Sequence, residues 1–279
     1  MRLATLLILL LFIAAPAESA TVVFLIGERE YETRETLPRW AADWLEPAGH
    51  DCIFVHALAN DRDRFPGASL VDRADLLVIS VRRRALPKAD LDRVRAHIAA
   101  GRPVLGIRTA CHAFDPKGEL PEGHDAWRTF DVDVLGSRYD NHLKTDGCTI
   151  TPRADAAAHP VLAGLPPQPW ESEGSLYRMF DLDPAADRLV DGLAVEKGET
   201  KIFPVVWVRT LESGSRVFST TLGSASDFEQ PAMNKMLANG IAWCLKQPVG
   251  PVAMQSSSLM SSESNEPPAW NEPARTVPR

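Results

Sequence analysis

The chain has 279 residues, a formal net charge of −7 and a calculated isoelectric point near 5.5. Hydrophobic residues make up 45% of it and charged residues 24%, which is typical of a globular protein with a core of ordinary size. The acidic balance argues against a nucleic-acid partner, which requires a basic surface, and the single basic cluster, Arg82-Arg83-Arg84, is too short to supply one.

Residues 1–20 have the pattern of a secretory signal peptide. Arg2 provides the positive start, Leu3 to Ala15 form an apolar stretch too short to cross a bilayer, and Ala15-Pro16-Ala17 fits the small-x-small cleavage rule. Cleavage after Ala20 and an uncleaved N-terminal anchor are the alternatives. We therefore expect a periplasmic or secreted protein with no stable membrane span after processing.

The first half of the mature chain alternates between strand and helix patterns. Apolar runs typical of buried strands cover Thr21–Ile26, Cys52–Ala57, Ala74–Val81 and Val104–Ile107. Apolar residues at helical spacing mark Thr33–Ala48, which Gly49 closes, and a helix that starts at Pro87 and ends before Gly101. This order predicts an α/β fold with a mostly parallel sheet and helices on both sides.

The second half is less regular. The region from Asp115 to Asp187 is rich in proline, glycine and charge, which predicts short strands and long functional loops. Pro204–Thr210 and Arg216–Leu222 flank a turn and predict an antiparallel hairpin, and Pro231–Leu245 has the pattern of a final helix. The composition then changes to Ser, Glu, Pro and Asn, so we expect one α/β domain over residues 21–248 and a disordered tail over 249–279.

The four cysteines are Cys52, Cys111, Cys148 and Cys244. They lack the paired spacing of a zinc motif, and we expect neither a bound metal nor a cofactor. Export permits disulfides, but a fold of this size does not need them, so disulfide bonds and buried free thiols are both open.

The turn after Val104–Ile107 is the most informative segment. Ligands bind at the carboxyl end of such strands, and a sharp strand-to-helix turn there can present a nucleophile. The residue at the tip is Arg108, which stays protonated and cannot act as a nucleophile or base. Its planar fork suits a carboxylate, a phosphate or vicinal hydroxyls, while an internal ion pair with Glu28 or Glu173 is the alternative.

Further ligand-binding candidates follow from the topology. Glu28 and Tyr31 come after the first strand and Arg82 after the third, so they should reach the same sheet edge as Arg108 and its neighbour Thr109. Another candidate, Asp227, follows a glycine-containing loop, or else belongs to the N-cap region of the last helix.

Three residues are candidate catalytic acid–base groups: His112, His142 and Glu173. The structural alternative for His142 is a hydrogen-bonding loop histidine. Cys111 lies past the turn and is expected to pack inward, because adjacent helical side chains point about 100° apart and rarely form a Cys–His dyad. Trp170, Tyr177 and Trp207 are suited to stacking on a sugar ring or to core packing.

An ordered set of motifs carries a family resemblance. The set comprises Gly27-Glu-Arg-Glu-Tyr31, Gly106-Ile-Arg-Thr-Ala-Cys-His-Ala-Phe114, Tyr139-Asp-Asn-His142, Ser172-Glu-Gly-Ser-Leu-Tyr-Arg178, Pro204-Val-Val-Trp-Val-Arg-Thr210, Arg216-Val-Phe-Ser-Thr-Thr-Leu-Gly223, Asp227-Phe228 and Asn239-Gly-Ile-Ala-Trp243. Together, over roughly Thr21 to Lys246, the chain resembles the ThuA-like family, named for a trehalose-utilisation protein, and in particular its exported members from planctomycete-type bacteria.

The resemblance implies a flavodoxin-like three-layer sandwich similar to class I glutamine amidotransferases. In those enzymes the turn is Gly-x-Cys-x-Gly, with the cysteine as nucleophile and a distant His–Glu pair. In this sequence Arg108 stands at the cysteine position and Ala110 at the second glycine, so amide hydrolysis by that route is not expected. The family name implies carbohydrate metabolism.

These observations predict an exported domain that binds a small polar ligand, carbohydrate-related, in the crevice above Gly106–His112. A hydrolase or isomerase using the three acid–base candidates, with Arg108 stabilising negative charge, is one form of this hypothesis. A non-catalytic binding or interaction module is the alternative, and a metal-dependent hydrolase using His112 and His142 is a third. Whether the protein is an enzyme is left open at this stage.

Overall fold

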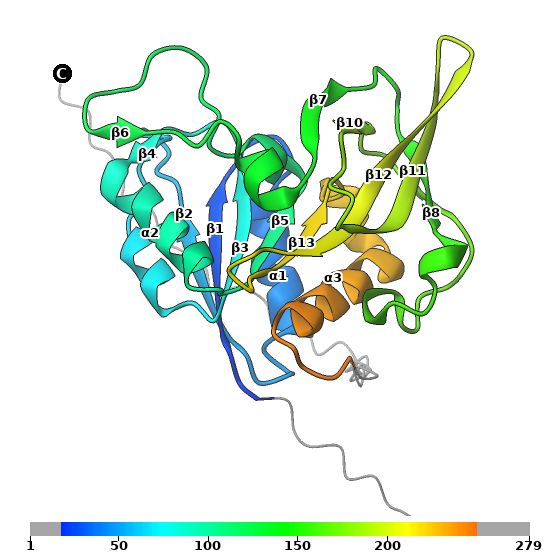
Figure 1. The fold of residues 1–279 in the computed structure, drawn as a ribbon, viewed down its shortest axis with the longest axis horizontal. Helices are drawn as coiled ribbons and strands as arrows, with labels where there is room; N and C mark the ends of the chain where they lie inside the picture. Colours follow the sequence, from blue (N-terminus) through cyan, green and yellow to red (C-terminus); the bar gives the residue numbers. More distant parts are fainter. Residues whose placement is uncertain (1–17, 250–279) are drawn as a thin grey trace, which may run out of the picture.

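Five parallel strands form the centre of the fold. They are β1 (Thr21–Gly27), β2 (Asp51–His56), β3 (Leu76–Val81), β5 (Val104–Ile107) and β13 (Arg216–Thr220), and they lie in the order β2-β1-β3-β5-β13. Every residue of β3 and β5 is buried, as expected for apolar strands covered on both faces. The computed structural model describes residues 18–249 (Figure 1).

An antiparallel extension completes a nine-stranded sheet beyond β13. It consists of β12 (Glu199–Thr210), β11 (Asp187–Glu196), β8 (Cys148–Pro152) and β9 (Trp170–Ser172). β12 and β13 form the predicted hairpin, with Val206 opposite Thr220. β12 begins at Glu199, five residues before the predicted start at Pro204, and the long β11–β12 ribbon projects at the upper right of Figure 1.

Helices cover both faces of the sheet. α1 (Thr33–Trp44) and α3 (Pro231–Cys244) pack on one face, where Leu37 and Met233 join a core with Phe24. α2 (Lys88–Ala99) packs on the other, where Leu91 and Val23 belong to a second core. The predicted three-layer α/β sandwich with a mostly parallel sheet is therefore confirmed. α1 ends at Trp44 rather than at the predicted Ala48, because Pro47 lacks an N–H and disfavours a helical residue before it.

Small elements complete the chain. β7 (Arg138–His142) pairs with β10 (Tyr177–Phe180), and β4 (Leu86–Pro87) pairs with β6 (His124–Asp125), each as a two-stranded antiparallel sheet. Short helical turns occupy Ala68–Arg73, Arg108–His112, Asp131–Leu135, Ala154–Ala156, Pro160–Leu162 and Ala225–Glu229. The middle region thus holds short strands and loops, and its β7–β10 pair lies beside the turn that follows β5.

Several predictions concern the chain ends and the cysteines. Residues 1–17 of the predicted signal peptide and residues 250–279 of the predicted tail lie outside the described residues. Among residues 18–249, no helix has the length and apolarity that crossing a bilayer requires. All four cysteines are free, and three of them are buried, so the thiol alternative holds in this structure.

Candidate functional site

A cavity of about 560 Å³ lies at the carboxyl edge of the parallel sheet. Its walls come from the segments after β1 and β3, from the turn Arg108–His112, from the loop after that turn, and from the β7–β10 pair. Its lining comprises Glu30, Tyr31, Arg82, Arg83, Cys111, His112, Asp115, Lys117, Arg128, Thr129, Asp131, Val132, Arg138, Tyr139, Asp140, Asn141, His142 and Tyr177. This is the edge where open α/β sheets bind ligands.

All three tyrosines of the chain line this cavity. The hydroxyls of Tyr31 and Tyr177 are 3.2 Å apart, and the rings of Tyr139 and Tyr177 have centroids 5.0 Å apart. His112 stacks on Tyr139 at 4.5 Å, and the pairing of β10 with β7 places Tyr177 opposite His142. Burial raises the pKa of the Tyr139 phenol, so this hydroxyl is neutral and can donate a hydrogen bond at ordinary pH.

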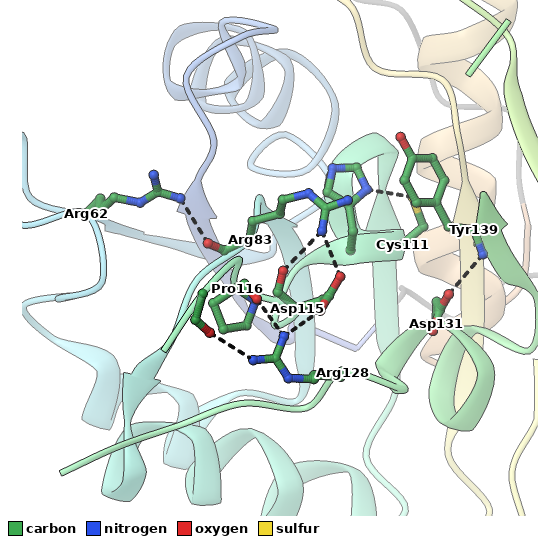
Figure 2. A network of polar contacts seen from close by, with 10 residues as sticks. Arg62, Arg83, Cys111, Asp115, Pro116, Arg128, Asp131 and Tyr139 are labelled. Atoms are coloured by element: carbon green, nitrogen blue, oxygen red, sulfur yellow. Dashed lines mark hydrogen bonds and ion pairs between the residues drawn. The ribbon is translucent and has the colours of Figure 1, made fainter. Parts of the chain in front are cut away.

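The arginines of the wall have carboxylate partners. Arg82 pairs with Glu30 at 2.9 Å, while Asp115 accepts from Arg83 at 2.7 Å and from Arg128 at 3.0 Å. Figure 2 shows Asp115 held between these two guanidinium groups. Each arginine named here has a carboxylate partner, although one carboxylate serves two of them and the lysine of the wall joins no ion pair among residues 18–249.

Asp131 provides a further carboxylate in the wall. Its Oδ2 accepts the backbone N–H of Tyr139 at 2.9 Å, a contact visible in Figure 2, and its Oδ1 accepts that of Val132 at 2.9 Å. Burial raises its pKa above the ordinary value of an aspartate, despite these hydrogen bonds. The residue therefore fixes the start of β7 and with it the position of Tyr139.

Cys111 and His112 are in contact, although adjacent side chains were expected to diverge. The Cys111 Sγ lies 3.3 Å from the His112 Nδ1 and 3.2 Å from the carbonyl oxygen of Arg108. Burial raises the pKa of the Cys111 thiol well above its ordinary value and lowers the pKa of His112 to about 3. Both groups are neutral at pH 7, so the pair is not the thiolate–imidazolium arrangement of a cysteine nucleophile.

Arg108 lies behind the tyrosines rather than in the cavity wall. It is 2% exposed, and its backbone φ of 43° places it in the left-handed region. Its guanidinium carbon is 4.1 Å from the ring centroid of Tyr31 and 4.7 Å from that of Tyr177, and Nη1 donates to the carbonyl of Thr221 at 2.8 Å. Cation–π contacts thus surround this charge.

The ion pair of Arg108 with Glu28 or Glu173, which was the alternative to ligand binding, is not formed among residues 18–249. Glu173 is exposed, and the carboxylate of Glu28 is occupied by other donors. Gly174 passes so close to the guanidinium that a Cβ there would lie 2.9 Å from Nη1. The close approach of this loop explains the glycine and closes the inner side of the arginine.

Two predicted ligand-binding carboxylates hold turns instead. Glu28 accepts the backbone N–H groups of Glu30, Tyr31 and Thr33 at 2.7–2.8 Å, together with the Thr33 hydroxyl at 2.5 Å. Asp227 accepts from the Ser172 hydroxyl at 2.6 Å, from the Gly223 N–H at 2.7 Å, and from the N–H and hydroxyl of Ser224. Asp227 completes a capping box for the short helix Ala225–Glu229, so it does belong to a cap, but not to that of the last helix as the alternative had it.

The structure thus divides the residues proposed from sequence. Tyr31, Arg82, His112 and His142 line the cavity, and Arg108 lies behind it. Glu28, Thr109, Glu173 and Asp227 do not line it. Sequence reasoning missed Tyr139, Asp131 and Asn141 as site residues, although Tyr139 and Asn141 stand in a motif that carries the family resemblance. Among residues 18–249, no three His, Cys, Asp or Glu side chains are grouped to hold a metal.

Comparison with known families identifies the protein's relatives. The family ThuA, described as Trehalose utilisation, matches residues 22–244. The chain belongs to the ThuA family. No curated protein matches it. The more specific resemblance to planctomycete-type members stays a prediction.

Two solved structures of ThuA-like proteins share the fold of this ThuA family chain. A ThuA-like protein from Parabacteroides merdae is 16% identical, with a TM-score of 0.59 over 84% of this chain and 93% of its own. A ThuA-like protein from Bacteroides uniformis is 14% identical, with a TM-score of 0.57 over 84% and 95%. A glutamine amidotransferase from Methylobacillus flagellatus also matches, at 11% identity and a TM-score of 0.43 over 77% and 72%.

Proposed function

We propose that the cavity binds a small, uncharged, carbohydrate-related ligand. The observation that carries the proposal is the gathering of all three tyrosines of the chain in one wall, beside His112 and His142. Aromatic faces stack on the apolar faces of sugar rings, and neutral phenol and imidazole groups exchange hydrogen bonds with hydroxyls. A volume of about 560 Å³ is in the range of small-molecule sites.

The pairing of three wall arginines favours an uncharged ligand. Arg82, Arg83 and Arg128 each have a carboxylate partner, so an anionic ligand would compete with Glu30 or Asp115 for them. A sugar hydroxyl needs no such exchange, because it accepts from and donates to paired groups at their free edges. The description of the family as Trehalose utilisation supports the same ligand class.

If the ligand is converted, His142 is the acid–base group that the cavity offers. It is exposed in β7 and its Nδ1 contacts the carbonyl of Leu143 at 2.9 Å, which leaves Nε2 free of that contact. His112 is a weak base, because burial lowers its pKa to about 3. The resulting reaction would be hydrolysis or isomerisation without a covalent intermediate.

A binding-only function is the second candidate, and the state of the turn favours it. Arg108 occupies the tip and is buried, while the Cys111 thiol is protonated, so the turn holds no activated nucleophile. In that case the ligand is bound and not turned over.

Calorimetric titration with neutral mono- and disaccharides, sugar acids and sugar phosphates tests the ligand class. We expect a neutral sugar to bind, Tyr139→Ala to weaken it at least about tenfold, and Tyr139→Phe to weaken it less. Trp44→Ala is the control, because Trp44 is also partly buried but lies outside this cavity. Binding of charged sugars alone, or equal affinity of Tyr139→Ala and wild type, would refute the proposal.

Turnover is tested separately with the sugar that binds. Product formation followed by NMR should be lost in His142→Gln with affinity kept, and unchanged in His124→Gln, whose ring lies outside the cavity. Binding without product in the wild type would select the binding-only function. We also propose that residues 1–20 direct export, and N-terminal sequencing of the protein from the periplasm or medium would show whether cleavage follows Ala17 or Ala20.

A further inference from the structure

Three consecutive arginines follow β3, and the third differs from the other two in its burial and in its lack of an ion pair. Arg82 pairs with Glu30 and Arg83 pairs with Asp115, with side chains 36% and 21% exposed. Arg84 is 4% exposed, its Nε has no hydrogen-bond partner, and it joins no ion pair among residues 18–249. An unpaired buried cation destabilises the folded state, so the burial of Arg84 requires a partner group that the described side chains do not supply.

Arg84 lies in the wall of a second cavity, of about 490 Å³. This cavity lies at the carboxyl ends of β1 and β2, where Gly27, Glu28 and Ala57 form part of its lining, and it extends to the first turn of α1. It shares no lining residue with the tyrosine-lined cavity. The two cavities are therefore separate places for separate ligands.

One carboxylate lines the same cavity as Arg84 and another acts on its charge, and both already have other donors. Glu28 accepts four hydrogen bonds from the turn that follows it. Asp63 accepts the backbone N–H of Ala85 at 3.2 Å and lies 4.0 Å from the Nε of Arg62. Burial, followed by the field of Arg62, lowers the pKa of Arg84 to about 10 against the opposing attraction of Asp63, so the guanidinium remains charged at pH 7.

Apart from Glu28, whose buried oxygens the turn occupies, the other charges of the second cavity lie at its rim. Arg29 and Arg34 are exposed, and so are Glu32 and Glu35. Arg29 donates to the carbonyls of Leu58 and Ala59, at 3.0 and 2.7 Å. Rim charges of both signs select weakly between ligands, whereas the buried guanidinium at the wall selects strongly for an anion.

We propose that this second cavity binds a small organic oxyanion, a carboxylate or a phosphate, through the guanidinium of Arg84. A planar fork with unpartnered N–H groups matches two oxygens of such an anion in a bidentate pair. The bound anion supplies the hydrogen bonds and the counter-charge that the buried side chain lacks. This site is independent of the neutral ligand proposed above.

The probes are inorganic phosphate and acetate, titrated separately into the full chain in a buffer free of both. Calorimetry should show one anion bound per chain, and the stronger of the two probes identifies the source of the oxyanion. Arg84→Met should weaken binding at least about tenfold, and Arg84→Lys should weaken it less, because lysine keeps the charge and loses the fork. Arg62→Met removes a neighbouring charge outside the cavity and should retain binding.

Thermal unfolding separates a ligand residue from a structural one. Without anion, Arg84→Met should unfold at the same or a higher temperature than wild type, because it removes an unpaired buried charge. With anion, the midpoint should rise in the wild type and stay constant in Arg84→Met. A lower midpoint of Arg84→Met without anion, equal anion effects in both proteins, or no binding of either probe to the wild type would each overturn the proposal.

Discussion

The substitution Glu28→Gln should destabilise the protein by about 3 kcal/mol, although it keeps the size and shape of the side chain. Glu28 is 5% exposed, and each of its oxygens accepts two hydrogen bonds. The amide oxygen can take over the N–H groups of Glu30 and Tyr31. The amide nitrogen then faces Thr33, whose hydroxyl can rotate to accept but whose N–H is left without an acceptor.

The magnitude follows from these contacts. Hydrogen bonds to a charged acceptor contribute about 1.5–3 kcal/mol each, and leaving a buried N–H unsatisfied costs about 1–3 kcal/mol. For a domain of this size, 1 kcal/mol moves the unfolding midpoint by about 2–4 °C, so we expect a fall of about 6–12 °C.

Denaturant and thermal unfolding of Glu28→Gln and Glu35→Gln measure the effect. Glu35 is an exposed acid in the first turn of α1, and its neutralisation should cost only about 0.5 kcal/mol through the helix dipole. A loss below about 1 kcal/mol in Glu28→Gln, or one equal to that of Glu35→Gln, would show that the carboxylate does not hold the turn that presents Tyr31.

Three further predictions follow from buried groups. Burial lowers the pKa of His97 to about 4 and that of His112 to about 3, so between about pH 6.5 and 4 the unfolded chain takes up protons that the folded chain does not. The free energy of unfolding should therefore fall with acid by up to ~1.4 kcal/mol per pH unit for each histidine. An unchanged urea midpoint between pH 7 and 4.5 would contradict this. Gly174→Ala should cost about 1–3 kcal/mol in urea unfolding by pressing on Arg108, and a wild-type midpoint would refute the contact. Because burial raises its pKa, Cys111 should resist iodoacetamide at pH 8 until the chain unfolds, and mass spectrometry showing rapid labelling of the folded protein would disprove this.

The sequence predicts the layers of the fold well because the buried strands are strongly apolar. Leu76–Val81 and Val104–Ile107 carry too few polar residues for any place but the centre of a sheet, and they occupy it. Local sequence patterns fail at the ends of elements. Gly49 suggested that α1 would continue to Ala48, but Pro47 ends the helix earlier, at Trp44. The far end of the β11–β12 ribbon was also missed, and it lies outside the core, because its apolar residues Val195 and Ile202 are exposed.

The site is less predictable because it is built from long-range pairs. Tyr31 and Tyr177 are 146 residues apart in sequence, yet their hydroxyls are 3.2 Å apart. Topology correctly brought Tyr31 and Arg82 to one edge, since both follow parallel strands. Topology did not predict where a side chain such as that of Glu28 points, because a carboxylate at a strand end can accept hydrogen bonds from the backbone of a turn as readily as it can bind a ligand.

The position of Arg108 explains how this edge differs from a nucleophile turn. A catalytic side chain at the tip must face the crevice, whereas the guanidinium here folds beneath Tyr31 and Tyr177 and bonds to the carbonyl of Thr221. The rings that cover the arginine are the same rings that line the cavity. The tip has thus become a support for the aromatic wall, and the groups available to a ligand lie one layer further out, on β7 and on the turn after β1. The proposed recognition at this edge therefore depends on the aromatic wall, and any chemistry proposed there depends on residues that the strand tip does not supply.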